Sequence, residues 1–113
     1  MKISLSVIIM LVVVSVAPNK VMAENTMTAQ DLLQVCTTPD MDWISFCNGF
    51  FQAVHDQQAF AGKVCAPDGI TRTNLVEVYE TNAAILIERD PAVGEKPAVD
   101  IAGKILIAVF PCN

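Results

Sequence analysis

Apolar residues recur at spacings of three and four along most of the chain, which is the period of an α-helix. The clearest example runs from Asp42 to about Ala61. Its apolar positions are Trp43, Cys47, Phe50, Phe51 and Val54, and Phe46 and Phe60 extend the same face. The stripe predicts a long helix whose aromatic residues belong to the core. Gly49 interrupts it, and a glycine within a helix is expected where another backbone comes close.

Three further segments show the same period. Their apolar stripes contain Leu32, Leu33 and Val35 in the first, Leu75, Val76, Tyr79, Ala83, Leu86 and Ile87 in the second, and Ala98, Ile101, Ala102, Ile105, Leu106 and Val109 in the third. The sequence thus predicts an all-α fold with no strand. The four predicted helices cover residues 28–36, 42–61, 71–88 and 97–109.

The helix ends follow from residues with known preferences. Thr28, followed three residues later by Asp31, has the pattern of a capping box. Asp42 is expected to cap the long helix, and Thr71 or Thr73 the next. Asp90-Pro91 ends that helix because a residue before proline is pushed away from helical angles. Pro97 suits the first turn of the last helix, so residues 92–96 are expected to be a connection.

The N-terminal segment has the pattern of a secretory signal peptide. Lys2 precedes an apolar run over residues 3–16, and Val21-Met22-Ala23 offers a cleavage site after Ala23. A membrane anchor is the alternative, but the run of about 14 residues is shorter than the ~20 that span a bilayer. We therefore expect residues 1–23 to be removed and residues 24–113 to form a single small domain in the periplasm.

The net charge of the exported chain indicates which class of macromolecule it can bind. Cleavage would remove two of the seven basic residues and none of the twelve acidic ones, which leaves a net charge of about −7. Such a surface repels nucleic acid. A basic protein is a better partner, since complementary fields speed the encounter.

Four cysteines lie in this small exported domain, at positions 36, 47, 65 and 112. An even number in an oxidising compartment predicts two disulfides. A zinc site is not expected, because there is no C-x-x-C pair. Three pairings are open. If the helices alternate in direction, Cys36 meets Cys47 at one end and Cys65 meets Cys112 at the other, and the hypothesis is a disulfide-stabilised four-helix up-and-down domain.

The sequence contains no convincing catalytic pattern. Cys47 and His55 are separated by about 12 Å along one helix and lie on faces about 80° apart, so they cannot form a nucleophile–base pair. Glu77, Glu80 and Glu88 are expected to be solvated charges. The sequence predicts neither an enzyme nor a cofactor or metal site.

Several segments together resemble a known family. They are Leu32-Leu33-Gln34-Val35-Cys36, Cys47-Asn48-Gly49-Phe50-Phe51-Gln52-Ala53, Cys65-Ala66-Pro67, Pro97-Ala98-Val99-Asp100-Ile101-Ala102 and Val109-Phe110-Pro111-Cys112. In order and spacing these resemble the Rap/Tai immunity proteins of type VI secretion. The resemblance implies a small helical, disulfide-bonded periplasmic protein, often a dimer, that inhibits a peptidoglycan amidase effector. By this resemblance, the expected partner of the present chain is a secreted amidase effector.

By position, the family places the effector contact in the connection between the last two long helices. Here that connection is residues 89–96, in which Arg89, Asp90, Glu95 and Lys96 are the candidate partner-binding residues. Pro91 and Pro97 stiffen it, and a stiff segment loses less entropy on binding. An ordinary helix connection is the alternative.

Two other functions remain open on the sequence. One is a periplasmic stress chaperone similar in style to HdeA, although the charged fraction of 17% is low for such a protein. The other is a structural envelope module without an effector partner. The apolar stripes also suit either a single-chain core or a core shared by a homodimer.

Overall fold

The computed structural model describes residues 26–113, so the predicted signal peptide lies outside the described residues. Four α-helices and one short 3-10 helix follow in the order α2 (Ala29–Cys36), α3 (Met41–Phe60), α4 (Arg72–Arg89), η1 (Pro91–Glu95) and α5 (Ala98–Val109). The described part of the chain has no regular strand and only two isolated bridges, between Thr28 and Pro97 and between Val64 and Pro111. The predicted all-α fold is confirmed.

The caps explain most of the helix boundaries. Thr28 and Asp31 form the predicted capping box of α2, and Thr71, rather than Thr73, caps α4. The expected cap of α3 was wrong, since Asp40 takes that place and its carboxylate accepts from the backbone N–H groups of Asp42 and Trp43. Two residues further toward the N-terminus, Asp40 has the extended backbone that a cap requires.

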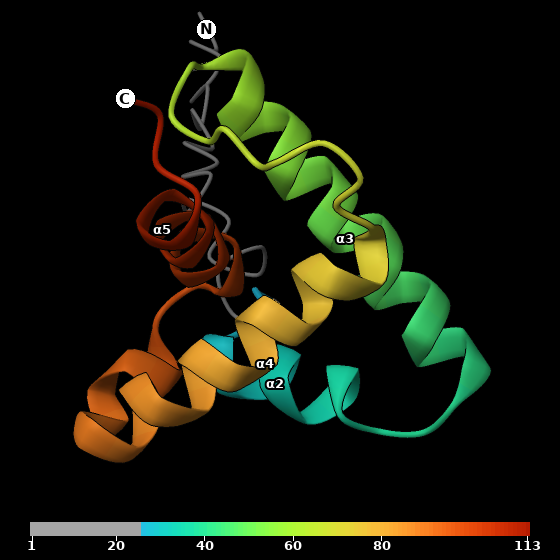
Figure 1. The fold of residues 1–113 in the computed structure, drawn as a ribbon. Helices are drawn as coiled ribbons and strands as arrows, with labels where there is room; N and C mark the ends of the chain where they lie inside the picture. The colour runs from blue at the N-terminus through green and yellow to red at the C-terminus, as the bar shows by residue number, and fades with distance from the viewer. Residues whose placement is uncertain (1–25) are drawn as a thin grey trace, which may run out of the picture.

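Helix α4 is central to the packing, because it contacts α2, α3, η1 and α5. In Figure 1, α3 and α4 cross, α5 is seen nearly end-on, and the chain turns sharply in the orange-brown segment between α4 and α5. No described helix has the length and apolar character needed to cross a membrane.

The core is built around Tyr79 of α4. Its ring lies 5.0 Å from that of Phe51 in α3, and its hydroxyl donates a buried hydrogen bond of 2.7 Å to the carbonyl oxygen of Ala29 in α2. Burial raises the pKa of Tyr79, so the hydroxyl stays a donor. One side chain therefore joins three helices. The other large, fully buried side chains are Leu32, Leu75, Leu106 and Cys47.

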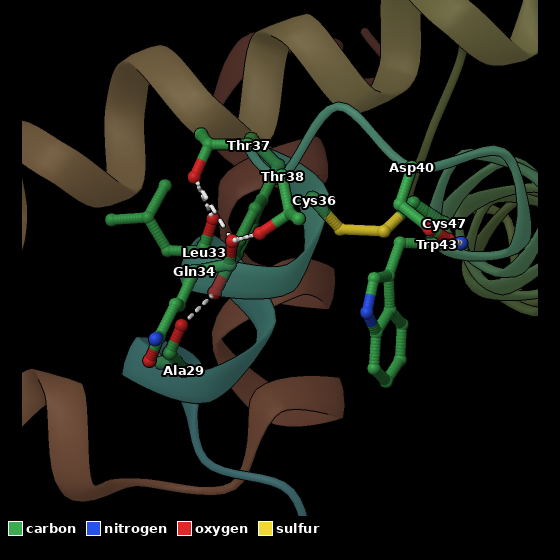
Figure 2. The surroundings of a disulfide bond; sticks show 10 residues. Ala29, Leu33, Gln34, Cys36, Thr37, Thr38, Asp40, Trp43 and Cys47 are labelled. Atoms are coloured by element: carbon green, nitrogen blue, oxygen red, sulfur yellow. Dashed lines mark hydrogen bonds between the residues drawn. A yellow bond between two sulfur atoms is a disulfide. The ribbon is translucent and has the colours of Figure 1, made fainter.

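Both predicted disulfides are present. The Cα atoms of Cys36 and Cys47 are 5.7 Å apart, which joins the end of α2 to α3. Those of Cys65 and Cys112 are 5.0 Å apart, which joins the loop after α3 to the C-terminus. Figure 2 shows the first bond at the end of α2, where the Thr37 and Thr38 hydroxyls donate to carbonyls of the last turn and satisfy acceptors that a helix end leaves open.

Beside the second disulfide, the backbone N–H of Cys65 donates to the carbonyl of Phe110 at 2.8 Å. Each disulfide thus lies at a place where two segments also meet through other contacts.

Several residues expected in the core are exposed instead. Trp43 and Phe46 of α3, Leu86 of α4 and Val109 of α5 are each more than a third exposed, and Phe60 is 97% exposed. Each lies on an apolar stripe, but the crossing helices cover only part of each stripe. The period identifies a helix face, whereas the neighbouring helices decide how much of that face is buried.

The expectation for Gly49 was also wrong. A Cβ atom added there would have no neighbour within 4 Å, so no second backbone approaches it. The helix bears the conformational cost of glycine without a packing benefit.

Gly49→Ala is therefore expected to stabilise the protein by about 1 kcal/mol, the difference in helix propensity between the two residues. Denaturant unfolding of the oxidised protein measures the change. Gly103→Ala is the contrasting variant, because its Cβ would lie 3.2 Å from the Gln58 side chain and the gain should be smaller. Equal stability of Gly49→Ala and the wild type would contradict an open environment at residue 49.

Candidate partner-binding surface

The four predicted contact residues lie at one turn of the chain. Arg89 ends α4, Asp90 caps η1, Glu95 ends η1 and Lys96 follows it. All four side chains are exposed. In Figure 1 this turn forms the corner of the molecule between α4 and α5. We call residues 89–96 the corner turn.

The corner turn is more ordered than the predicted connection. Residues 92–96 were expected to be a connection between two helices, and here Pro91–Glu95 forms a 3-10 helix. The Asp90 carboxylate accepts from the backbone N–H of Ala92 at 3.2 Å, and the backbone N–H of Val93 donates to the Asp90 carbonyl at 3.0 Å. Pro91 fixes its own φ angle at the first position. Asp90 therefore shapes the turn in addition to carrying a charge.

The backbone of the corner turn is also attached to the rest of the protein. The N–H of Ala29 in α2 donates to the carbonyl of Lys96 at 2.8 Å. Gly94 is buried, and a Cβ atom there would lie 3.3 Å from the Cβ of Gln30 and 3.4 Å from Cγ2 of Ile87. A side chain at this position would force the neighbouring side chains of α2 and α4 to shift by a few tenths of an ångström, so glycine suits this close approach. The result is a fixed backbone that presents exposed charged side chains.

A groove of about 510 Å³ runs beside the corner turn, between α4 and α5. Arg89 and Lys96 of the turn line it together with Lys104 of α5, and its apolar lining includes Ile85, Leu86, Ile105 and Val109. Sequence analysis missed this feature because Leu86 and Val109 were assigned to the core. Lys104 could have indicated the groove from the sequence, because it is a lysine among the apolar residues of α5.

The first half of α3 is a second apolar surface. Met41 is 74% exposed, and Trp43, Ile44 and Phe46 are each exposed by about two fifths. The rings of Trp43 and Phe46 meet edge to face with centroids 5.7 Å apart, and Phe46 in turn lies 5.8 Å from Phe50. Contiguous exposed apolar side chains mark interaction sites. We call these four exposed residues the α3 surface.

Cys47 and His55, the candidate nucleophile and base, serve other roles. The Cys47 sulfur is bonded to Cys36, so it offers no thiolate. His55 hydrogen-bonds to Asp56 at 3.0 Å, and this bond, followed by one from Gln52, lowers the pKa of Asp56.

Glu77 and Glu80 line a hollow next to the Cys36–Cys47 disulfide. Partial burial, and then the charge of Glu77, raise the pKa of Glu80. Glu88 lies apart from them, exposed near the end of α4. Among residues 26–113, no group of three or more His, Cys, Asp or Glu residues is placed to hold a metal ion.

These features define a small, disulfide-bonded helical protein whose exposed turn and apolar surfaces suit binding to another protein. The chain matches the family model of the Rap1a immunity proteins over residues 28–112, and it belongs to that family. The match includes all four cysteines and every described helix. No curated protein and no solved structure matches the chain.

Proposed function

We propose that this protein is an immunity protein of type VI secretion that binds a peptidoglycan amidase effector in the periplasm and occludes its active-site cleft. Membership of the Rap1a immunity family carries the proposal. The two disulfides support an oxidising compartment. The N-terminal pattern supports export by a signal peptide cut after Ala23.

Occlusion needs a protruding element that keeps its shape. The corner turn has this property, because hydrogen bonds to the Asp90 carboxylate and to the Lys96 carbonyl hold its backbone. A segment already fixed in one conformation loses little conformational entropy on binding. We place Arg89, Asp90, Glu95 and Lys96 at the contact with the effector, with the carboxylates facing basic groups around its cleft.

Glu95→Lys is the cleanest test of the corner turn, because Glu95 is exposed and does not cap η1. Reversal of its charge should weaken binding to the cognate effector about tenfold or more, which is about 1.4 kcal/mol. Asp68→Lys makes the same charge change at an exposed position in the loop before α4 and should have little effect. Binding is measured by calorimetry with the amidase encoded beside the gene, together with inhibition of peptidoglycan cleavage.

Two negative results have different meanings. Equal affinity of Glu95→Lys, Asp68→Lys and the wild type would remove the corner turn from the interface. Failure of the wild-type protein to bind or inhibit the neighbouring effector would contradict the proposed function itself.

We also propose that two copies pair through the α3 surface. Its aromatic residues follow the pattern of core positions, yet one chain leaves them uncovered. A twofold pair brings the same apolar surface of each copy together, and this would give Trp43 and Phe46 the partners that their own chain does not provide.

The pairing predicts that Phe46→Glu gives a monomer, because two added carboxylates would be brought together in an apolar contact. Sedimentation equilibrium measures the mass. Phe60→Glu is the matched control, since Phe60 is 97% exposed and lies outside the α3 surface. A monomeric wild type, or a dimer that persists in Phe46→Glu with unchanged helix content, would contradict this interface.

A further inference from the structure

The groove between α4 and α5 has an unusual charge for this protein. The chain as a whole carries a net charge of −5, yet the charged residues that line the groove are Arg89, Lys96 and Lys104. Among residues 26–113, no acidic residue lines it. Within residues 26–113, none of these three cations forms an ion pair. Three of the five basic residues among residues 26–113 thus line one opening.

The groove is also apolar where those cations converge. Ile85 is 42% exposed, and Leu86 and Val109 are each 39% exposed, so apolar side chains face solvent there. The volume of about 510 Å³ falls within the range of about 300–1,000 Å³ found for ligand sites. The complement of this site is a segment with apolar side chains for the groove and a carboxylate for its rim.

We infer that the groove between α4 and α5 binds an acidic, apolar peptide segment of the effector. The inference rests on the proposed function and adds the chemistry of the effector segment. Charge complementarity indicates the carboxylate, since Arg89 from α4 and Lys104 from α5 can approach it from the two walls. Hydrogen bonds between ionised partners are stronger than those between neutral groups, and the apolar lining adds the burial of hydrophobic side chains.

Continuity with the corner turn indicates the same partner. Arg89, Val93 and Lys96 belong to the corner turn and also line the groove. An effector that covers the turn therefore reaches the groove without a second docking event. The acidic surface elsewhere attracts a basic protein, whereas the groove selects one acidic segment of that protein. Together, the acidic surface and the basic groove determine how the effector is oriented.

Two substitutions test the groove without altering the corner turn. Lys104→Glu reverses an exposed charge on α5, and Ala108→Trp fills the groove from an exposed helix position. Each should weaken effector binding about tenfold or more. Arg72→Glu repeats the charge change, and Ala84→Trp repeats the added bulk, at exposed positions that do not line the groove. These controls should bind within about twofold of the wild type. Circular dichroism and thermal unfolding establish that each variant is folded.

The groove can also be tested without the effector. A short peptide of alternating leucine and aspartate should shift the methyl NMR signals of Ile85 and Ile105 in the protein purified from the periplasm. The matched peptide of leucine and lysine should not shift them, and Lys104→Glu should abolish the response. Decanoate is tested in the same way. If decanoate shifts these signals and the acidic peptide does not, the groove binds an anionic amphiphile rather than a peptide, and the inference is overturned.

The outcomes separate the two proposals. If Glu95→Lys weakens effector binding while Lys104→Glu and Ala108→Trp bind like their controls, the proposed function stands and the groove is not used. If the effector does not bind the wild type at all, the proposed function fails, and the peptide experiment alone decides whether the groove selects acidic apolar segments.

Discussion

Two disulfides are the constraint on which the rest of the structure depends. A domain this small has a thin core, and here one tyrosine joins three helices through a ring contact and one hydrogen bond. Cys36–Cys47 holds α2 against α3, and Cys65–Cys112 holds the C-terminus against the loop after α3. The disulfides restrict the unfolded chain, so the fold tolerates apolar side chains left outside its core. Those exposed side chains are then available for binding.

The corner turn depends on the same arrangement. Its backbone is fixed through α2, whose N-terminus pairs with Lys96 and whose C-terminus is joined to α3 by a disulfide. Helix α2 therefore connects a covalent constraint at one end to the proposed effector contact at the other. The groove follows from how α4 and α5 meet beside that turn. An acidic protein with a charged corner and a basic apolar groove has features that suit binding to another protein, and membership of an immunity-protein family agrees with this interpretation.

Sequence patterns predicted the parts of this structure that local chemistry controls. The capping box at Thr28 and the proline at position 97 located helix starts, and alternating helix directions predicted both disulfide pairs. The patterns could not predict which stripe residues are buried, because the crossing of α3, α4 and α5 leaves Trp43 and Leu86 exposed. For the same reason the groove was missed. The order of the corner turn could not be predicted either, since it depends in part on the close approach of Gly94 to Gln30, which is distant in the sequence. The roles of Arg89, Asp90, Glu95 and Lys96 in binding stay a prediction.

The central claim is that oxidised sulfur keeps this small helical frame rigid enough to bind. Denaturant unfolding of the paired serine variants at Cys36 and Cys47, and at Cys65 and Cys112, tests it most directly. The loops that these bonds close have sequence separations of 11 and 47 residues. Loss of the bonds should therefore destabilise the protein by about 3 and about 4 kcal/mol. Wild-type stability in both paired variants, or free thiols in the protein recovered from the periplasm, would contradict the account.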